Sequence, residues 1–141
     1  MRTLVLDTNI VLDVFVFDDA AAKPLAAALE EGEIEWVATQ SMRDELERVL
    51  AYPHLATRLA FYGLDAAGVL SRFDRHARIV DVAAKAGVTC SDPDDQKFID
   101  LAVANRCALL SKDAAVLTMR KRMAALGCHV GKTEALSEPA R

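Results

Sequence analysis

Short apolar runs alternate along this chain with stretches in which apolar residues recur at helical spacing. Runs of strand length occupy residues 3–6, 34–38, 78–82, 108–111 and 128–130. Helix-period stretches occupy residues 10–16, 20–31, 41–51, 65–76, 94–105 and 114–126. Short strands separated by helices pair in parallel, and the helices then cover both faces of the sheet. The pattern predicts an α/β fold with a central parallel sheet of about five strands.

The length of the chain, 141 residues of 52% apolar composition, suits one domain with one core. We expect residues 1–131 to form this domain and residues 132–141 to form a flexible C-terminal tail. The apolar stretch near the start is interrupted by Asp7, Asn9 and Asp13, so it is shorter than the ~20 apolar residues that cross a membrane. No secretory signal pattern is present. We therefore expect a cytoplasmic protein with no membrane partner.

Charge and cysteine content narrow the function only a little. The net charge of -4 gives no overall attraction for nucleic acid, so a polyanionic substrate would need bound cations or a local basic patch. Cys90, Cys107 and Cys128 form no C-x-x-C pair and have no histidine at zinc-finger spacing. We expect them to be buried, reduced thiols.

Two aspartates follow predicted strands directly. Asp7 comes after the first strand and Asp113 after the fourth. Ligands of open parallel sheets bind at the carboxyl ends of the strands, which places both carboxylates at a binding crevice. The alternative for each is helix capping. For Asp7, Thr8 and Asn9 can cap instead, and Asn9 can orient the Asp7 carboxylate.

Glu45 lies at the edge of an apolar helix face. That face consists of Met42, Leu46, Val49 and Leu50. A carboxylate beside buried side chains is costly unless it is paired, so we expect Glu45 to face a cleft or a cation. An ion pair with Arg48 one turn later is the alternative. Ser41 and Asp44 fit a capping-box variant at the start of this helix, and Asp44 and Arg48 are spaced for a surface ion pair.

A second acidic segment begins the helix predicted at residues 94–105. Asp92 suits the N-cap and Pro93 the first helical position. Asp95 lies in the middle of the inward face that Phe98, Ile99 and Ala102 form, whereas Asp100 lies off this face and is expected to be solvated.

Four acids are therefore predicted at one rim of the sheet: Asp7, Glu45, Asp95 and Asp113. Like charges brought together in this way need cations. Carboxylate oxygens suit Mg²⁺ or Mn²⁺, whereas zinc would favour histidine or cysteine. The sequence predicts a divalent metal site.

Four segments in this order and spacing resemble a PIN domain. They are Leu4-Val5-Leu6-Asp7-Thr8-Asn9, Asp44-Glu45-Leu46, Asp92-Pro93-Asp94-Asp95-Gln96-Lys97-Phe98-Ile99-Asp100-Leu101-Ala102 and Leu109-Leu110-Ser111-Lys112-Asp113. The chain is similar to the PIN-family toxins of bacterial and archaeal toxin-antitoxin modules, the VapC-like group, from residue 2 to about residue 130. The resemblance implies a Rossmann-like three-layer α/β/α sandwich.

The resemblance also implies the roles of individual residues. Asp7, Glu45, Asp95 and Asp113 would be catalytic, with Asp7, Asp95 and Asp113 holding Mg²⁺ or Mn²⁺ and Glu45 completing the shell or positioning the attacking water. Thr8, Asn9 and Ser111 would support the acids through hydrogen bonds. Ala115 is a departure, because many relatives carry a further aspartate there. The resemblance therefore does not imply a second metal site in this chain.

By resemblance, the chain is a metal-dependent endoribonuclease that hydrolyses single-stranded or looped RNA, and the toxin partner of a small antitoxin protein. Its products would carry a 5′-phosphate and a 3′-hydroxyl. Two alternatives stay open: an RNA-processing nuclease outside a toxin-antitoxin pair, and an inactive PIN-like binding module. Aspartyl-phosphate enzymes also place an aspartate after the first strand, but they need a second acid where this chain has Asn9.

Contacts beyond the acids are predicted from the basic and apolar residues. Arg43, Arg48 and Lys112 are the candidates for contact with RNA phosphates. The denser basic clusters, residues 72–78 and 120–122, lack the interleaved aromatics of a base-stacking surface. The helices at 10–16 and 20–31 carry more apolar residues than one sheet face needs, which favours a homodimer or higher homo-oligomer.

Overall fold

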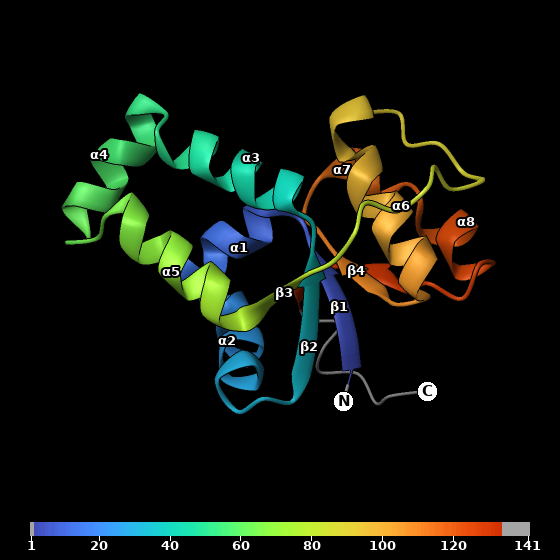
Figure 1. Cartoon of the computed structure of the whole chain (residues 1–141), viewed down its shortest axis with the longest axis horizontal. Helices are drawn as coiled ribbons and strands as arrows, with labels where there is room; N and C mark the ends of the chain where they lie inside the picture. The colour runs from blue at the N-terminus through green and yellow to red at the C-terminus, as the bar shows by residue number, and fades with distance from the viewer. Residues whose placement is uncertain (1, 134–141) are drawn as a thin grey trace.

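The computed structural model describes residues 2–133, which form a five-stranded parallel sheet with helices on both faces (Figure 1). The strands are β1 (Arg2–Leu6), β2 (Ile34–Ala38), β3 (Ala77–Ile79), β4 (Ala108–Leu110) and β5 (Val130–Gly131). Their order across the sheet is β3-β2-β1-β4-β5. Leu4 is opposite Trp36 of β2 on one side and Ala108 of β4 on the other, so β1 lies at the centre. The predicted α/β class and the parallel sheet are confirmed.

The helices form two layers, one on each side of the sheet. The first layer contains α1 (Thr8–Phe15), α2 (Lys23–Glu30), α3 (Gln40–Leu50), α4 (Pro53–Phe61) and α5 (Ala66–His76). The second contains α6 (Gln96–Asn105), α7 (Ala114–Leu117) and α8 (Arg120–Ala124), and short 3₁₀ turns precede α2 (Ala20–Ala22) and α6 (Pro93–Asp95). Figure 1 shows the two groups on opposite sides of the strands. Between residues 2 and 133, no helix is long and apolar enough to cross a membrane.

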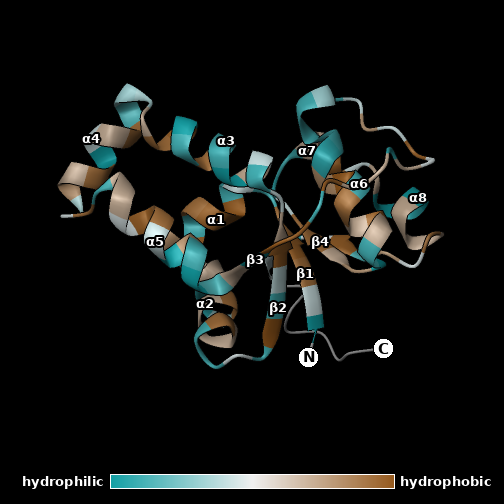
Figure 2. Cartoon of the chain, in the orientation of Figure 1, coloured by the Kyte–Doolittle hydropathy of each residue, from teal (hydrophilic) through white to brown (hydrophobic). Residues whose placement is uncertain are grey.

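The central strands are apolar throughout because both of their faces are covered. Leu4 to Leu6 of β1 and Leu109 and Leu110 of β4 are all buried, and Figure 2 shows β4 and most of α1 as hydrophobic. Trp36 of β2 packs edge-on against Phe73 of α5, with ring centroids 4.8 Å apart. This packing joins the first helix layer to the sheet.

Several element boundaries differ from the sequence prediction. α4 was not among the predicted helices, and it begins at Pro53, whose missing N–H costs nothing at the first helical position. The helix predicted at 114–126 is instead two short helices, α7 and α8. The predicted cap of α3 at Ser41 is wrong: Thr39 caps it, and its hydroxyl accepts from the Met42 N–H. Asp44 accepts from Gln40 rather than from Arg48.

The expected surplus of apolar surface on the first two helices is not present. Ile10, Val11, Leu12, Val14 and Phe15 of α1 are buried within the chain. The buried residues of α2, Leu25 and Leu29, pack into the same core. The prediction assumed that α1 packs against one sheet face alone, but α3 and α5 also cover it. These two helices therefore give no argument for a dimer.

A segment without regular structure, residues 80–92, leads from β3 to α6 and is fixed by α6 itself. Gln96 accepts from the Cys90 N–H at 2.6 Å and donates to the Val88 carbonyl at 3.0 Å. Asp100 accepts from the Ala86 N–H at 2.9 Å and from Gln96 at 2.8 Å. The prediction that Asp100 is solvated is wrong, because the sequence does not show that this segment returns along α6.

Cys90, Cys107 and Cys128 are free and buried, as predicted. Burial raises the pKa of the Cys107 thiol to about 12. Of the segment expected to be a flexible tail, Thr133 is buried, and residues 134–141 lie outside the described residues.

Asp100→Ala should destabilise the protein. The substitution leaves the partly buried Ala86 N–H without its acceptor, which costs about 1–3 kcal/mol. Urea unfolding measures the loss, and hydrogen exchange should show faster exchange of the Ala86 amide. Asp81→Ala, an exposed position in the same segment, is the control and should change the free energy of unfolding by less than about 0.5 kcal/mol. Equal effects of the two substitutions would contradict the anchoring role of Asp100.

Candidate functional site

The site lies where neighbouring strands send the chain to opposite faces of the sheet. β1 and β4 are adjacent, but β1 continues into α1 in one helix layer, whereas β4 continues into α7 in the other. Such a reversal leaves a crevice at the carboxyl ends of the two strands. Asp7 directly follows β1, and Asp113 follows β4 after Ser111 and Lys112. Their placement at the same edge is a consequence of the strand order.

Asp7 is buried and accepts a hydrogen bond from Ser111. Its side chain makes no cap hydrogen bond to α1, although Asp7 occupies the N-cap position. The Ser111 hydroxyl donates to Asp7 Oδ2 at 2.6 Å. Burial raises the pKa of Asp7 above its ordinary value, and the charges of Asp113 and Glu45 add to this effect, while the Ser111 hydroxyl and the nearby backbone N–H of Asn9 lower it. Asn9 acts on Asp7 through its backbone, since its side chain is exposed.

Ser111 connects the two strand-end acids. While its hydroxyl donates to Asp7, the same oxygen accepts from the Asp113 N–H at 3.0 Å. Asp113 Oδ1 accepts from the Ala115 N–H at 2.8 Å, so Asp113 also caps α7. The capping alternative therefore applies to Asp113 and not to Asp7.

Asp95 reaches the site from the start of α6. It ends the 3₁₀ turn that Asp92 caps by accepting from the Asp94 N–H, as the sequence predicted for Asp92. Asp95 is 9% exposed, and its Oδ2 is buried without a hydrogen-bond partner among the described residues. Burial raises the pKa of Asp95 to about 7, with further contributions from the charges of Asp7, Asp113 and Asp92, while Lys97 lowers it.

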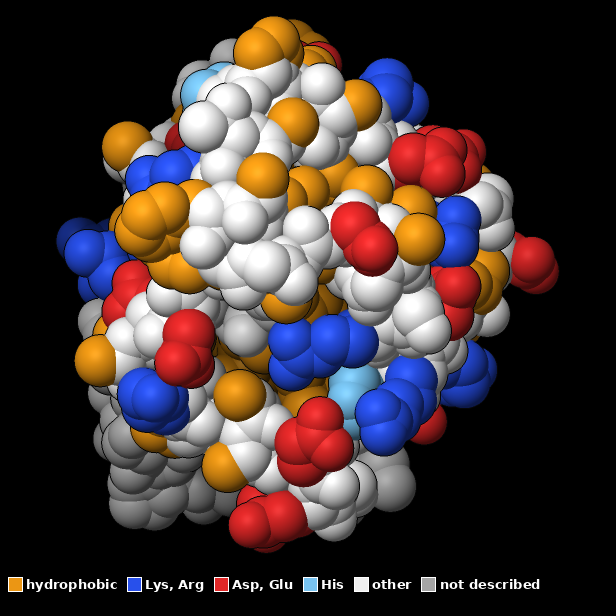
Figure 3. All heavy atoms as spheres, turned by 90° about the vertical axis from the view of Figure 1, so that its left-hand side faces the viewer, with side chains coloured by type: hydrophobic (Ala, Val, Ile, Leu, Met, Phe, Trp, Pro, Cys, Tyr) orange, Lys and Arg blue, Asp and Glu red, His pale blue; other side chains and the backbone are white. Residues whose placement is uncertain are grey.

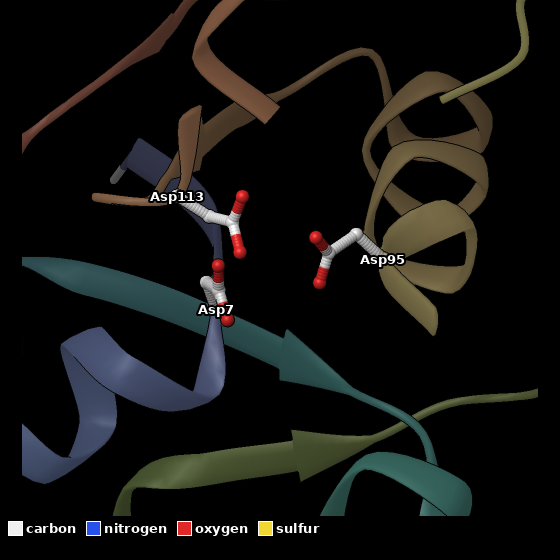
Figure 4. Close-up of side chains that lie close together, drawn as sticks. All are labelled: Asp7, Asp95 and Asp113. Carbon is white, nitrogen blue, oxygen red and sulfur yellow. The ribbon is translucent and has the colours of Figure 1, made fainter. Parts of the chain in front are cut away.

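Asp7, Asp95 and Asp113 converge, and we refer to them as the aspartate cluster. One carboxylate oxygen of each lies within 4.8 Å of one from each of the others (Figure 4). Figure 4 shows the Asp95 side chain pointing from its helix toward the other two. The donors are all oxygens, and an unpartnered buried oxygen faces like charges, so the cluster fits a hard divalent cation such as Mg²⁺ or Mn²⁺.

Glu45 of α3 is beside the aspartate cluster and not part of it. Thr8 donates its hydroxyl to Glu45 Oε2 at 2.5 Å, and Lys97 Nζ lies 2.9 Å from Oε1. The alternative of an Arg48 partner does not hold, since Lys97 takes that role. Sequence reasoning missed Lys97, because the two partners are 52 positions apart and on different helices. The one available signal was its place two residues after Asp95.

The predicted phosphate contacts are partly engaged elsewhere. Arg43 makes a two-pronged ion pair with Asp74 of α5, at 2.7 and 2.9 Å. Lys112 Nζ lies 2.6 Å from Oδ2 of Asp13, whose side chain is only 7% exposed. Arg48 is exposed on α3. Arg43 therefore ties α3 to α5, and Lys112 ties the loop after β4 to α1.

Comparison with known proteins assigns the family. A family model described as PIN domain matches residues 3–115. The chain belongs to the PIN domain family. A chain in the crystal structure of VapBC2 from Rickettsia felis, bound to a DNA fragment from their promoter, has a similar fold with a TM-score of 0.60. The two chains are 14% identical, and the alignment covers 92% of this chain and 98% of that chain. A search of curated proteins finds no significant match.

The matched region of this PIN domain includes the aspartate cluster and Glu45. Ala115, where the resemblance implies a further aspartate in many relatives, donates its N–H to Asp113 and brings no carboxylate to the site. Among residues 2–133, Asp7, Asp95 and Asp113 are the one group of three or more such side chains whose ligand atoms converge. The geometry of this PIN domain thus offers one cation position.

The stability of the PIN domain without divalent cations should fall as the pH rises from about 4 to about 7. The raised pKa of Asp95 means that the folded protein keeps a proton that the unfolded chain, with a value near 3.8, has lost. This contribution is fully present below pH 3.8 and is lost as the pH rises through about 7. Urea unfolding at pH 4 to 8 in the presence of a chelator measures it. Asp95→Asn should flatten the profile, whereas the exposed control Asp44→Asn should keep it. A parent profile that rises through this range would refute the assignment.

Proposed function

We propose that this PIN domain is a Mg²⁺- or Mn²⁺-dependent endoribonuclease and the toxin of a toxin-antitoxin module. The observation that carries the proposal is the aspartate cluster at the β1/β4 crevice of a chain that belongs to the PIN family. Three carboxylates from separate elements converge within 4.8 Å, although burial and neighbouring negative charges raise the pKa values of Asp7 and Asp95. A cation is the simplest compensation for this arrangement.

The residues of the site would have different roles in phosphodiester hydrolysis. When bound, a divalent cation supplies charge stabilisation of the phosphate and activation of water. Asp7, Asp95 and Asp113 would hold it, and Ser111 fixes the orientation of Asp7 through its hydroxyl hydrogen bond. Glu45, which Thr8 and Lys97 hold beside the cluster, would position the attacking water and accept its proton. No nucleophilic side chain is needed.

RNA is the proposed substrate, in single-stranded or looped form, since unpaired segments fit a crevice better than a stiff duplex. The net charge of -4 and the aspartate cluster repel a polyanion, so cation binding must precede productive substrate binding. Arg48 is the predicted phosphate contact for which the described residues show no ion pair. Arg43 and Lys112 would contact phosphates only by sharing their present carboxylate partners.

A small antitoxin is the proposed protein partner. The similar fold in the structure of VapBC2 from R. felis, bound to a DNA fragment from their promoter, supports this. Figure 3 shows hydrophobic side chains interspersed with Lys and Arg on the face where α4 and α5 lie. A hollow of about 230 Å³ is lined there by Phe15, Leu64, Val69 and Arg72, among others. Phe61 of α4 is 81% exposed and lies next to Tyr62, which is 42% exposed. This exposed apolar surface also supports a homodimer, in place of the buried faces of α1 and α2.

Asp7→Asn and Asp95→Asn should each abolish RNA cleavage. Loss of a group that merely supports a metal ligand costs about 10–100-fold, and loss of a ligand should cost more. The assay is incubation with total cellular RNA, with Mg²⁺, Mn²⁺ or a chelator, followed by mapping of the cleaved ends, which should carry a 5′-phosphate and a 3′-hydroxyl. Asp44→Asn is the control, because Asp44 lies on α3 beside Glu45 but is exposed. Cleavage by Asp95→Asn at the parent rate would rule out the catalytic assignment, and a parent without activity would favour a binding module.

Expression of the parent in bacteria should arrest growth, and Asp95→Asn should relieve the arrest because it removes a ligand of the proposed cation. Colony counts after induction measure this, with total RNA integrity followed in parallel. Growth at the rate of an empty-vector culture, from a protein that cleaves RNA in vitro, would favour a processing nuclease over a toxin.

A further inference from the structure

The ion pair between Lys97 and Glu45 connects the two helix layers across the carboxyl ends of the strands. Glu45 belongs to α3 in the first layer and Lys97 to α6 in the second, which Figure 1 shows on opposite sides of the sheet. Lys97 Nζ lies 2.9 Å from Glu45 Oε1. The two side chains are only 28% and 20% exposed, so solvent screens this pair less than an ion pair on the open surface.

Lys97 is fixed by more than one contact. Besides Glu45, its ammonium donates to the backbone carbonyl of Asp94 and lies over the ring of Phe98, 4.9 Å from the centroid. A lysine has three N–H donors, of which two are used here. The position of Lys97 is therefore set by α6 and the 3₁₀ turn that precedes it, and Glu45 is the partner drawn to it.

Both oxygens of Glu45 are engaged by donors that do not belong to the aspartate cluster. Oε2 accepts from Thr8 and Oε1 from Lys97. The ligand atoms of Asp7, Asp95 and Asp113 converge, and Glu45 is absent from that group. A carboxylate this near to a cation site would join the ligands if nothing held it, because hard cations take as many oxygens as they can reach.

We propose that Lys97 is a positioning residue that holds Glu45 beside the aspartate cluster and out of the cation's ligand set. The proposal rests on the proposed nuclease function, in which Glu45 acts on water. Without Lys97, Glu45 becomes a fourth carboxylate ligand: the cation binds more tightly, and the water loses its proton acceptor. Opposite changes in affinity and rate distinguish this role from a merely structural ion pair, whose loss would weaken both or neither.

Lys97→Met removes the charge and keeps the apolar stem. Mn²⁺ binding to the RNA-free protein, followed by electron paramagnetic resonance of the free ion, should tighten about fivefold, since the released Glu45 carboxylate brings one more negative charge to the ion and a unit charge at this range is worth about that factor. The rate of RNA cleavage at saturating Mn²⁺ should fall about 10–100-fold. Lys97→Arg should restore most of the rate and the parent affinity. Lys23→Met, which removes an exposed lysine of α2 that pairs with Asp18, is the matched control and should change neither.

A double-mutant cycle tests whether Lys97 acts through Glu45. In a Glu45→Gln background, Lys97→Met should leave Mn²⁺ affinity within about twofold, because the carboxylate it restrains is gone. The same tightening in both backgrounds would show that Lys97 acts as a bare charge on the cluster, and it would overturn the proposal. Unchanged or weaker Mn²⁺ binding by Lys97→Met, in a variant folded by circular dichroism, would also overturn it, as would a parent that binds no Mn²⁺. Because binding is measured without RNA, a parent that binds Mn²⁺ and cleaves nothing would refute the proposed function and leave the cycle readable.

Discussion

Repulsion among the carboxylates of Asp7, Asp95 and Asp113 is the constraint to which the rest of the structure responds. Each arrives from a different element, and one oxygen of each lies within 4.8 Å of one from each of the others. Burial removes the water that would otherwise screen them, which is why the pKa values of Asp7 and Asp95 are raised. A fold keeps such an arrangement only when its strands and helices over-determine where the groups lie.

The supporting hydrogen bonds form a short network around this charge. The Ser111 hydroxyl donates to the Asp7 carboxylate and accepts from the Asp113 N–H, so one small side chain sets the relative position of two acids. Thr8 follows Asp7 in the chain and binds Glu45, which couples the end of β1 to α3. Lys97, on α6 of the second helix layer, brings a positive charge to Glu45. The network contains four acids but three side-chain donors, Ser111, Thr8 and Lys97, and the Oδ2 of Asp95 is left without a partner among the described residues.

Local sequence patterns were sufficient to predict the placement of those residues whose position depends on their neighbours in the chain. Asp7 and Asp113 could be placed because each follows an apolar run, and parallel strands bring such positions to one edge. The inward placement of Asp95 followed from helical spacing. The Lys97–Glu45 pair and the contact of Asp100 with Ala86 could not be predicted, since each depends on how separate segments pack. α4 was missed because Pro53 is compatible both with the end of one helix and with the start of the next.

The short strand β5 determines when, during synthesis of the chain, the site can assemble. β5 consists of Val130 and Gly131 alone, yet the Ser111 N–H donates to the Gly131 carbonyl at 2.9 Å. The serine that orients Asp7 is thus anchored by a residue more than a hundred positions after that aspartate. A growing chain on the ribosome has its first strand and first carboxylate early, but it lacks the anchor until Gly131 has been added and has left the exit tunnel. The order of synthesis itself delays assembly of the aspartate cluster until nearly the whole domain has been made.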